Sequence, residues 1–316
     1  MSTLDAAWHD RALLAAVARA YYLQNLSRVE IAEEFGISRF KVARMLVRAR
    51  EEGIVSIEIN DSGVVDESLS QQLKQALGLD HCLVVRSHGD DEAVREQIGL
   101  AAAVHLSSTL REGEVLGVAW GRTLNAAIRQ IERLPRLTIV QLTGVIAGDL
   151  SSSPVELVRQ VSQRSGGDVH AMFAPLLIDD IQVAAGVREH PDISAALGLF
   201  PQLTTAFLSV GAWNPPDTQI KPILPLDMLA AAVSGGCEAD IAGNLIAADG
   251  TLVDAGMQDR CISIRYEQLR RVPRVVAVAG GASKAQAVLA VSRGNLITEL
   301  IADHVLAERV LELHRA

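Results

Sequence analysis

A chain of 316 residues with 49% hydrophobic residues and a formal net charge of −9 has enough apolar material for two packed domains, which excludes an intrinsically disordered protein. Its longest uncharged stretch, residues 193–216, is interrupted by proline, glycine and polar residues, which excludes a membrane span. Cys82, Cys237 and Cys261 lack metal-ligand spacing and the N-terminus lacks the pattern of a signal peptide, so we expect a cytoplasmic protein with reduced thiols and no metal or cofactor.

Two helices joined by a short turn are predicted near the N-terminus, after a first helix over residues 10–24. Ser27 precedes Glu30 by three residues, the spacing of a reciprocal helix cap, and Ser38 is a second capping candidate. Gly36 between them is free to adopt the positive φ that such a turn requires. This pattern is typical of a helix-turn-helix.

The second of these helices, from Ser38 to about residue 52, has one apolar and one cationic side. Five basic residues and no acidic one lie between Gly36 and Arg50, in a chain whose overall charge is negative. Clustered cations on one helix favour phosphate binding. We therefore predict that this unit binds double-stranded operator DNA through Ser27, Ser38, Arg39, Phe40, Lys41, Arg44 and Arg48.

Gly53 is expected to end this helix, and residues 54–59 alternate as a short strand or wing would. We therefore expect a winged helix-turn-helix domain over residues 1–60. Residues 61–79 predict an amphipathic linker helix, which could pack on its own domain or on a second protomer. The remaining chain, residues 61–316, would form the effector-binding and oligomerisation domain.

Beyond Cys82, short apolar runs alternate with helical patterns, which is typical of an α/β domain with a parallel sheet. The runs are CLVV, EVLGVAW, LTIVQLT, VHAMF, TAFLSV, NLIA and RVVAVAG. Ligands of such sheets bind beyond the carboxyl ends of the strands. The residues that follow these runs are therefore the candidates for a binding site.

Two glycine-containing strand ends are suited to an anion. Backbone NH groups at a helix start attract negative charge, and hydroxyls and cations nearby add donors. The first strand end supplies Gly121, Arg122 and Thr123, and the second supplies Gly280, Gly281, Ser283 and Lys284. Thr143 and Asp240 lie between these two in the sequence, and Asp240 could accept hydrogen bonds from sugar hydroxyls.

The chain resembles the SorC family of sugar-binding transcriptional regulators along nearly its whole length. The similarity rests on residues 21–55, on LGVAWGRTLNAAI, on AADGT and on the segment from residue 272 to residue 306. It implies a Rossmann-like effector domain related to sugar-phosphate isomerases and CoA transferases, working as a dimer or tetramer. By position, Gly121 and Thr123 resemble the family's phosphate-binding turn, and Asp240 and Lys284 its sugar- and phosphate-contacting residues.

Two departures from the family pattern concern the ligand. Residues 120–123 read Trp-Gly-Arg-Thr where a member has Gly-Gly-Thr-Thr, and Thr143 replaces an arginine. A singly phosphorylated sugar and an unphosphorylated polyol therefore both stay open. The main hypothesis is a regulator whose operator binding responds to such an effector. The alternatives are a sugar-phosphate isomerase-like enzyme carrying a DNA-binding segment, and a Schiff base between Lys284 and an aldehyde effector.

Overall fold

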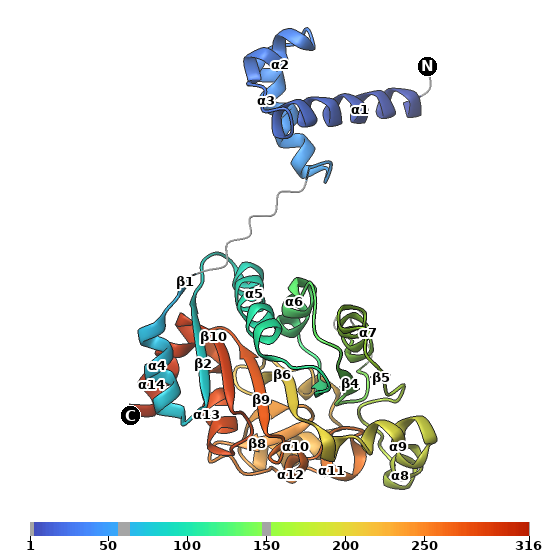
Figure 1. Cartoon of the computed structure of the whole chain (residues 1–316), viewed down its shortest axis with the longest axis vertical. Helices are drawn as coiled ribbons and strands as arrows, with labels where there is room; N and C mark the ends of the chain where they lie inside the picture. Colours follow the sequence, from blue (N-terminus) through green and yellow to red (C-terminus); the bar gives the residue numbers. More distant parts are fainter. Residues whose placement is uncertain (1–2, 56–63, 147–152, 316) are drawn as a thin grey trace. The chain divides into compact units, whose positions relative to one another are not determined.

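The computed structural model describes residues 3–55, 64–146 and 153–315, and the chain divides into two units, Met1–Asp61 and Ser62–Ala316 (Figure 1). Within the described ranges, none of the helices combines the length and apolar character that crossing a membrane requires. Cys82, Cys237 and Cys261 are buried free thiols, and burial raises the pKa of each to about 12.

The N-terminal unit consists of α1 (Thr3–Tyr22), α2 (Arg28–Glu34) and α3 (Arg39–Glu51). The first helix thus begins earlier than residue 10 and ends two residues before the predicted end. Apolar side chains of all three helices form one core, whose buried members are Leu14, Val17, Ala18, Ala20, Ile31, Val42, Met45, Leu46 and Ala49. The wing predicted for residues 54–59 lies largely outside the described residues, which stop at Val55.

The C-terminal unit is built on a mostly parallel sheet, as the alternating apolar runs predict. Its strands are β1 (Val64–Val65), β2 (His81–Arg86), β3 (Val115–Val118), β4 (Thr138–Gln141), β5 (Val169–His170), β6 (Thr205–Ala212), β7 (Cys237–Ile241), β8 (Asn244–Ala247), β9 (Arg274–Ala279) and β10 (Glu299–Asp303). The main order is β1-β2-β10-β9-β6-β3-β4-β5, in which only the β1–β2 pairing is antiparallel.

The register of the central strands brings their carboxyl ends to one edge of the sheet. Phe207 of β6 pairs with Val118 of β3 on one side and with Val276 of β9 on the other. Strands aligned in this way end near one another, so the loops that follow them share a surface. The sheet thereby fixes where a site can form.

Helices cover both faces of the sheet (Figure 1). They are α4 (Glu67–Leu77), α5 (Asp91–Thr109), α6 (Arg122–Gln130), α7 (Pro154–Ser165), α8 (Ile181–Glu189), α9 (Pro191–Leu197), α10 (Leu226–Ser234), α11 (Met257–Arg260), α12 (Tyr266–Leu269), α13 (Ala285–Arg293) and α14 (His304–Arg315), with short 3-10 helices η2 (Phe200–Gln202), η3 (Lys221–Ile223) and η4 (Ala282–Lys284).

Alternate residues of each central strand enter two separate cores. Val276 and Val278 of β9 pack with apolar side chains of α5, α6 and α7, whereas Val275 and Ala277 pack with those of α4, α13 and α14. Successive side chains of a strand point to opposite faces, and a parallel sheet covered on both faces therefore carries continuous apolar runs. This is why the runs could be recognised in the sequence.

The predicted helix over residues 61–79 is wrong at its N-terminal end. Val64 and Val65 form β1, and the Asp66 side chain accepts a 2.9 Å hydrogen bond from the Leu69 amide, so that α4 begins only at Glu67. Two β-branched residues before a capping aspartate favour this division. The buried side of α4 packs on α14 and β2 of its own chain, with Leu73 fully buried.

Besides β1, two more strands are not predicted from the sequence, and one predicted strand pairs differently from the expectation. β7 and β10 contain buried acidic residues and therefore do not read as apolar runs. β8, the NLIA run, forms an antiparallel hairpin with β7 instead of joining the parallel strands, and β7 pairs antiparallel with the end of β6. This hairpin brings Asp240 next to the carboxyl edge of the sheet.

Candidate functional site

The helix-turn-helix of the N-terminal unit is held by the predicted caps. The Glu30 amide donates to Ser27 Oγ at 3.3 Å while the Ser27 amide donates to Glu30 Oε2 at 2.8 Å. Ser38 Oγ accepts from the Lys41 amide at 3.2 Å, and Gly36 in the turn has a φ of 62°. Both serine hydroxyls accept from backbone amides, which leaves their own protons free for another acceptor.

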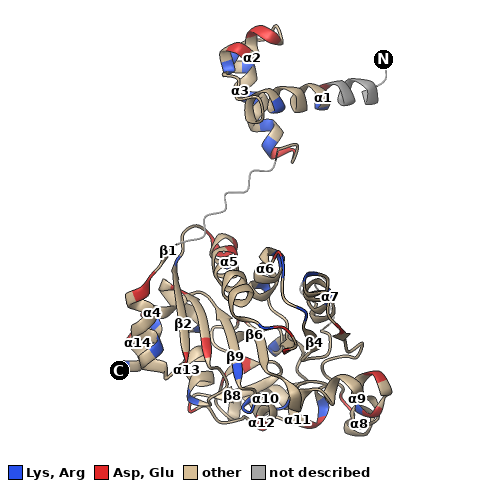
Figure 2. Ribbon diagram, in the orientation of Figure 1, with Lys and Arg blue, Asp and Glu red and all other residues tan. Residues whose placement is uncertain are grey.

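Lysine and arginine residues are distributed along α3 (Figure 2). Arg39, Lys41 and Arg44 are exposed, and the Phe40 side chain keeps 68% of its surface accessible. The Arg39 guanidinium lies 5.0 Å from the centre of the Phe40 ring. An exposed aromatic ring beside several cations on one helix is a surface suited to a nucleic acid groove.

Arg48 differs from the other cations of α3. Its guanidinium pairs with Asp10 of α1 and, at 2.5 Å, with Glu52. These two acids compensate its charge within the unit, and the pair with Asp10 links α1 to α3. Arg48 therefore also stabilises the packing of the unit, whereas Arg39, Lys41 and Arg44 have no ion pair with an acid among the residues that the structure describes.

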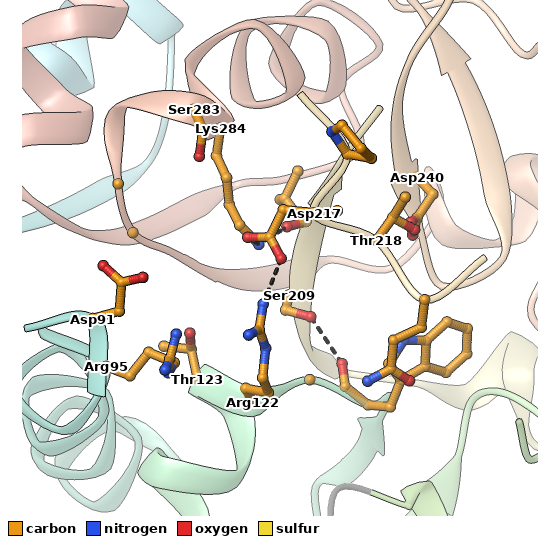
Figure 3. A pocket seen from close by; sticks show the side chains of 18 of the residues that line it. Asp91, Arg95, Arg122, Thr123, Ser209, Asp217, Thr218, Asp240, Ser283 and Lys284 are labelled. Atoms are coloured by element: carbon orange, nitrogen blue, oxygen red, sulfur yellow. Dashed lines mark hydrogen bonds and ion pairs between the residues drawn. The ribbon is translucent and has the colours of Figure 1, made fainter. Parts of the chain in front are cut away.

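A cavity of about 610 Å³ lies at the carboxyl ends of the parallel strands (Figure 3). The segments that follow β3, β6 and β9 contribute to it, together with β7 and the start of α5. Its polar and charged lining side chains are Asp91, Arg95, Arg122, Thr123, Ser209, Asp217, Thr218, Gln219, Asp240, Ser283, Lys284 and Asp303. A concave site with convergent polar groups is the usual form of a small-molecule pocket.

Glycine is required where two of the loops enter this cavity. Gly121 has a φ of 150°, and a Cβ atom there would overlap Ser209 Oγ. Gly281 has a φ of 87°, and its amide donates to Asp303 Oδ1 at 2.9 Å. Both turns therefore adopt a backbone that only glycine tolerates readily.

Three charged side chains meet inside the cavity (Figure 3). Arg122 Nη2 lies 2.5 Å from one carboxylate oxygen of Asp217, and Lys284 Nζ lies 3.3 Å from the other. Lys284 Nζ also donates to the Val210 carbonyl at 2.7 Å. Burial lowers the pKa of the Lys284 ammonium, although the Asp217 carboxylate acts in the opposite direction.

Asp240 is buried in β7, and the Thr218 hydroxyl donates a hydrogen bond to its carboxylate. Burial raises its pKa to about 6, against the opposing effects of the Thr218 hydroxyl and Lys284. The sequence gives Asp240 as a candidate acceptor for sugar hydroxyls, and the structure places it in a strand with only 4% of the residue exposed. A buried carboxyl group with a raised pKa on a cavity wall is a feature of functional sites.

Most of the predicted effector residues line this one cavity. They are Gly121, Arg122, Thr123, Asp240, Gly280, Gly281, Ser283 and Lys284. Thr143 is the exception and leaves the candidate site, because it is fully buried and forms an antiparallel bridge with Ser263. Segments around residues 175 and 262 cover the end of β4 and keep Thr143 from the cavity.

Several lining residues are not predicted from the sequence. Asp91, Arg95, Ser209, Asp217, Thr218, Gln219 and Asp303 all line the cavity. Ser209 lies near the end of the predicted strand β6, where the strand-end rule already applies, and Asp303 ends β10, which is not predicted from the sequence. Asp217 follows Pro215 and Pro216, a pattern that indicates only a turn.

Comparisons with known proteins agree with this architecture. Residues 65–312 match the family model described as "Putative sugar-binding domain". The sorbitol operon regulator of Klebsiella pneumoniae is 26% identical over 317 residues, covering 96% of this chain and 98% of that protein. The deoxyribonucleoside regulator of Bacillus subtilis (strain 168) is 25% identical over 298 residues, covering 93% and 95% of the two chains.

A solved structure shares the fold. The full-length sorbitol operon regulator SorC from Klebsiella pneumoniae superimposes with a TM-score of 0.72 at 24% sequence identity, covering 96% of this chain and 99% of that one. The matched family model covers well over half of the 316 residues, and the similarity of the regulators extends through the helix-turn-helix. The chain therefore belongs to the sugar-binding domain family of SorC-type transcriptional regulators.

Proposed function

We propose that this protein regulates transcription by binding operator DNA through α3, and that a sugar or polyol held in the strand-end cavity changes its affinity for that DNA. One observation carries the DNA-binding half of the proposal. Arg39, Lys41 and Arg44 are exposed opposite the buried side of α3, in a chain of net charge −9. Cations that replace condensed counterions on DNA contribute salt-dependent affinity, and side chains at base edges add specificity.

The cavity supports a carbohydrate-type effector. Carboxylates such as Asp217 and Asp240 accept hydrogen bonds from sugar hydroxyls, and Thr123 and Ser283 offer hydroxyls in return. The description of the matched family and the name of the sorbitol operon regulator point to the same class of compound. A sugar, a polyol and their phosphate esters all belong to this class.

Operator binding can be tested with a random duplex library. The full-length protein would select ligands from the library, and the affinity of selected duplexes would be measured at several salt concentrations. We expect Arg39→Ala and Arg44→Ala together to weaken binding by about 1 to 3 kcal/mol for each of the two side chains that reads a base. Arg19→Ala, which removes an exposed cation of α1, is the matched control. Unchanged binding in the double variant would remove α3 as the reader.

The response to an effector is the second test. A panel of sugars, polyols and their phosphates would first be screened by thermal shift and then by operator binding. Coupling between two sites is commonly 1 to 3 kcal/mol, so the effector should change operator affinity by roughly five- to 150-fold. Thr123→Ala removes a hydroxyl from the cavity wall, so we expect it to bind operator as the wild type does and to respond more weakly. A normal response would place the effector elsewhere.

An enzyme is the rival proposal, and the raised pKa of Asp240 is the observation that favours it. A base whose pKa is about 6 suits proton abstraction from a sugar carbon near neutral pH. The relatives, however, are named as regulators. Turnover of a sugar phosphate that disappears in Asp240→Asn would establish the enzyme.

Borohydride trapping followed by mass spectrometry tests the separate hypothesis of a Schiff base at Lys284.

Self-association is a further part of the proposal. Helix-turn-helix proteins commonly read two half-sites about one helical turn apart through a symmetric pair of subunits. The resemblance to the SorC family implies dimers or tetramers. Light scattering of the full-length protein, with and without a selected duplex, would give the oligomeric state. A monomer on DNA would contradict this part alone.

A further inference from the structure

The carboxylate of Asp217 joins the two cation-bearing loops of the cavity. One of its oxygens faces Arg122, the first residue of α6 after β3, at 2.5 Å, and the other faces Lys284, the last residue of η4 after β9, at 3.3 Å. Figure 3 shows the carboxylate lying between these two side chains. The position in which a phosphate would meet both cations is therefore filled by a group of the protein.

The other cation of the lining is also paired. Arg95 lies 3.0 Å from Glu92 on the same helix. Each lysine or arginine among the described lining residues thus has an acidic partner. The lining itself contains four carboxyl groups, those of Asp91, Asp217, Asp240 and Asp303, against the three cations. A site with this balance has no surplus positive charge for a dianion.

A phosphate ester entering this site would meet the Asp217 carboxylate or have to displace it. Like charges a few ångströms apart repel, and displacement would break two ion pairs that hold the loops together. A neutral polyol avoids both costs. Its hydroxyls can donate to the carboxylates and accept from the Thr123 and Ser283 hydroxyls.

We propose that Asp217 is a specificity-determining residue of this cavity, and that by filling the anion position between Arg122 and Lys284 it selects a neutral polyhydroxy compound over the phosphate ester of the same compound. The inference rests on the proposed effector-binding role of the cavity and narrows its ligand class. It gives Asp217 the role of an internal counterion, and gives Arg122 and Lys284 the role of holding that counterion in place.

The first test uses inorganic phosphate as the probe, measured by calorimetry on the full-length protein. Asp217→Asn keeps the size of the side chain and one acceptor oxygen but removes the charge. Asp227→Asn, which removes an exposed carboxylate of α10 outside the cavity, is the matched control. We expect Asp217→Asn to bind phosphate at least about tenfold more tightly than the wild type, since close charge pairs couple by more than 1 kcal/mol, and the control to match the wild type.

A double variant tests the position of the bound anion. If phosphate binds where the Asp217 carboxylate lay, Arg122→Gln added to Asp217→Asn should abolish the gain in phosphate affinity. A gain that survives the loss of Arg122 would place the anion elsewhere and overturn the assignment. Asp217→Ser also removes the carboxylate, and it replaces Asp217→Asn if the asparagine variant unfolds at a lower temperature than the wild type.

The second test compares matched ligands. Hexitols and pentitols and their monophosphates would be titrated into the wild type and Asp217→Asn. We expect the wild type to bind a neutral compound more tightly than its phosphate, and the variant to reverse or erase that preference. Tighter binding of the phosphate ester by the wild type would overturn the inference, as would a phosphate affinity unaltered by Asp217→Asn. None of these titrations contains DNA. A protein that fails to bind operator DNA would refute the proposed function, whereas the ligand preference of the cavity would still be measured independently.

Discussion

The buried carboxyl group of Asp240 should make the stability of the C-terminal unit depend on pH. Gly211 lies against it so closely that a Cβ atom at residue 211 would overlap Asp240 Oδ1, and solvent reaches only 4% of the aspartate. Burial disfavours the charged form, which raises the pKa to about 6 even though the Thr218 hydroxyl and Lys284 favour the carboxylate. The folded protein therefore holds this proton more tightly than the unfolded chain does.

The size of the effect follows from the difference in pKa. The pKa rises from 3.8 to about 6, and each unit corresponds to about 1.4 kcal/mol, which gives about 3 kcal/mol. Because the folded state binds the additional proton, the contribution of Asp240 to the free energy of unfolding is greatest below pH 4. It falls as the pH rises from about 4 to about 6 and stays low above that. Asp240→Asn should therefore match the wild type near pH 4 and exceed its stability by up to about 3 kcal/mol at pH 8.

Urea unfolding monitored by tryptophan fluorescence can measure this difference. Trp120 and Trp213 are buried in the C-terminal unit, and a Trp8→Phe background removes the tryptophan of the N-terminal unit. Asp227→Asn controls for the loss of one exposed carboxylate. If Asp240→Asn is less stable than the wild type at pH 8, attraction between Asp240 and Lys284 outweighs burial, and the predicted direction of the pH dependence is refuted.

Three further predictions concern the local structure. Gly121→Ala should lower the unfolding free energy of the C-terminal unit by about 1 to 3 kcal/mol in urea, because the new methyl group meets the Ser209 side chain; equal stability would show that the β3–α6 loop can shift. Ser38→Ala should cost about 1 kcal/mol of stability in the N-terminal unit, seen as faster hydrogen exchange in α3, because the Lys41 amide loses its cap; unchanged exchange would contradict this. Leu73→Ala should cost about 2 to 5 kcal/mol in the same urea assay, since it leaves a cavity under α4, and a loss below about 1 kcal/mol would mean that α4 is not part of the core.

The helix-turn-helix could be predicted from the sequence because its determinants are local. Ser27 and Ser38 cap helices whose first turns follow them directly, and Gly36 takes a left-handed conformation between them. Each of these interactions joins residues only a few positions apart. The parallel strands were equally recognisable, since burial on both faces requires an unbroken apolar run.

The strands that were missed contain charges whose partners are distant in the sequence. Glu299 begins β10, and its carboxylate lies 2.6 Å from His105 Nε2 and 2.7 Å from Arg274 Nε. Burial would raise its pKa, but the hydrogen bonds from His105 and Arg274 outweigh that and hold the pKa at about 2. At the other end of β10, Asp303 accepts from the Gly281 amide. A run bounded by two acids looks solvent-exposed until those partners are known.

The cavity also contains residues whose importance depends on partners that are distant in the sequence. Gly121 and Lys284 could be predicted because each follows an apolar run, and the rule that ligands bind at strand ends applies to each loop separately. Asp217 could not, because its importance arises only when the loops after β3, β6 and β9 lie side by side and place it between two cations. Thr143 also follows an apolar run, but its bridge to Ser263, which is distant in the sequence, covers it and keeps it out of the cavity.

The cavity depends on segments that are distant in the sequence, and this limits how an effector can act. The cavity exists only when β3, β6 and β9 are aligned, so a ligand held by their loops binds the folded C-terminal unit and not the unfolded chain. Such a ligand stabilises that unit by about 2.7 kcal/mol when present at about one hundred times its dissociation constant. The N-terminal unit has its own core and its own caps, and gains nothing from this directly. The whole protein must therefore exist in two arrangements that differ in operator affinity, and the effector must bind one of them more tightly than the other. An effector that binds both arrangements equally cannot shift the equilibrium between them, however tightly it binds.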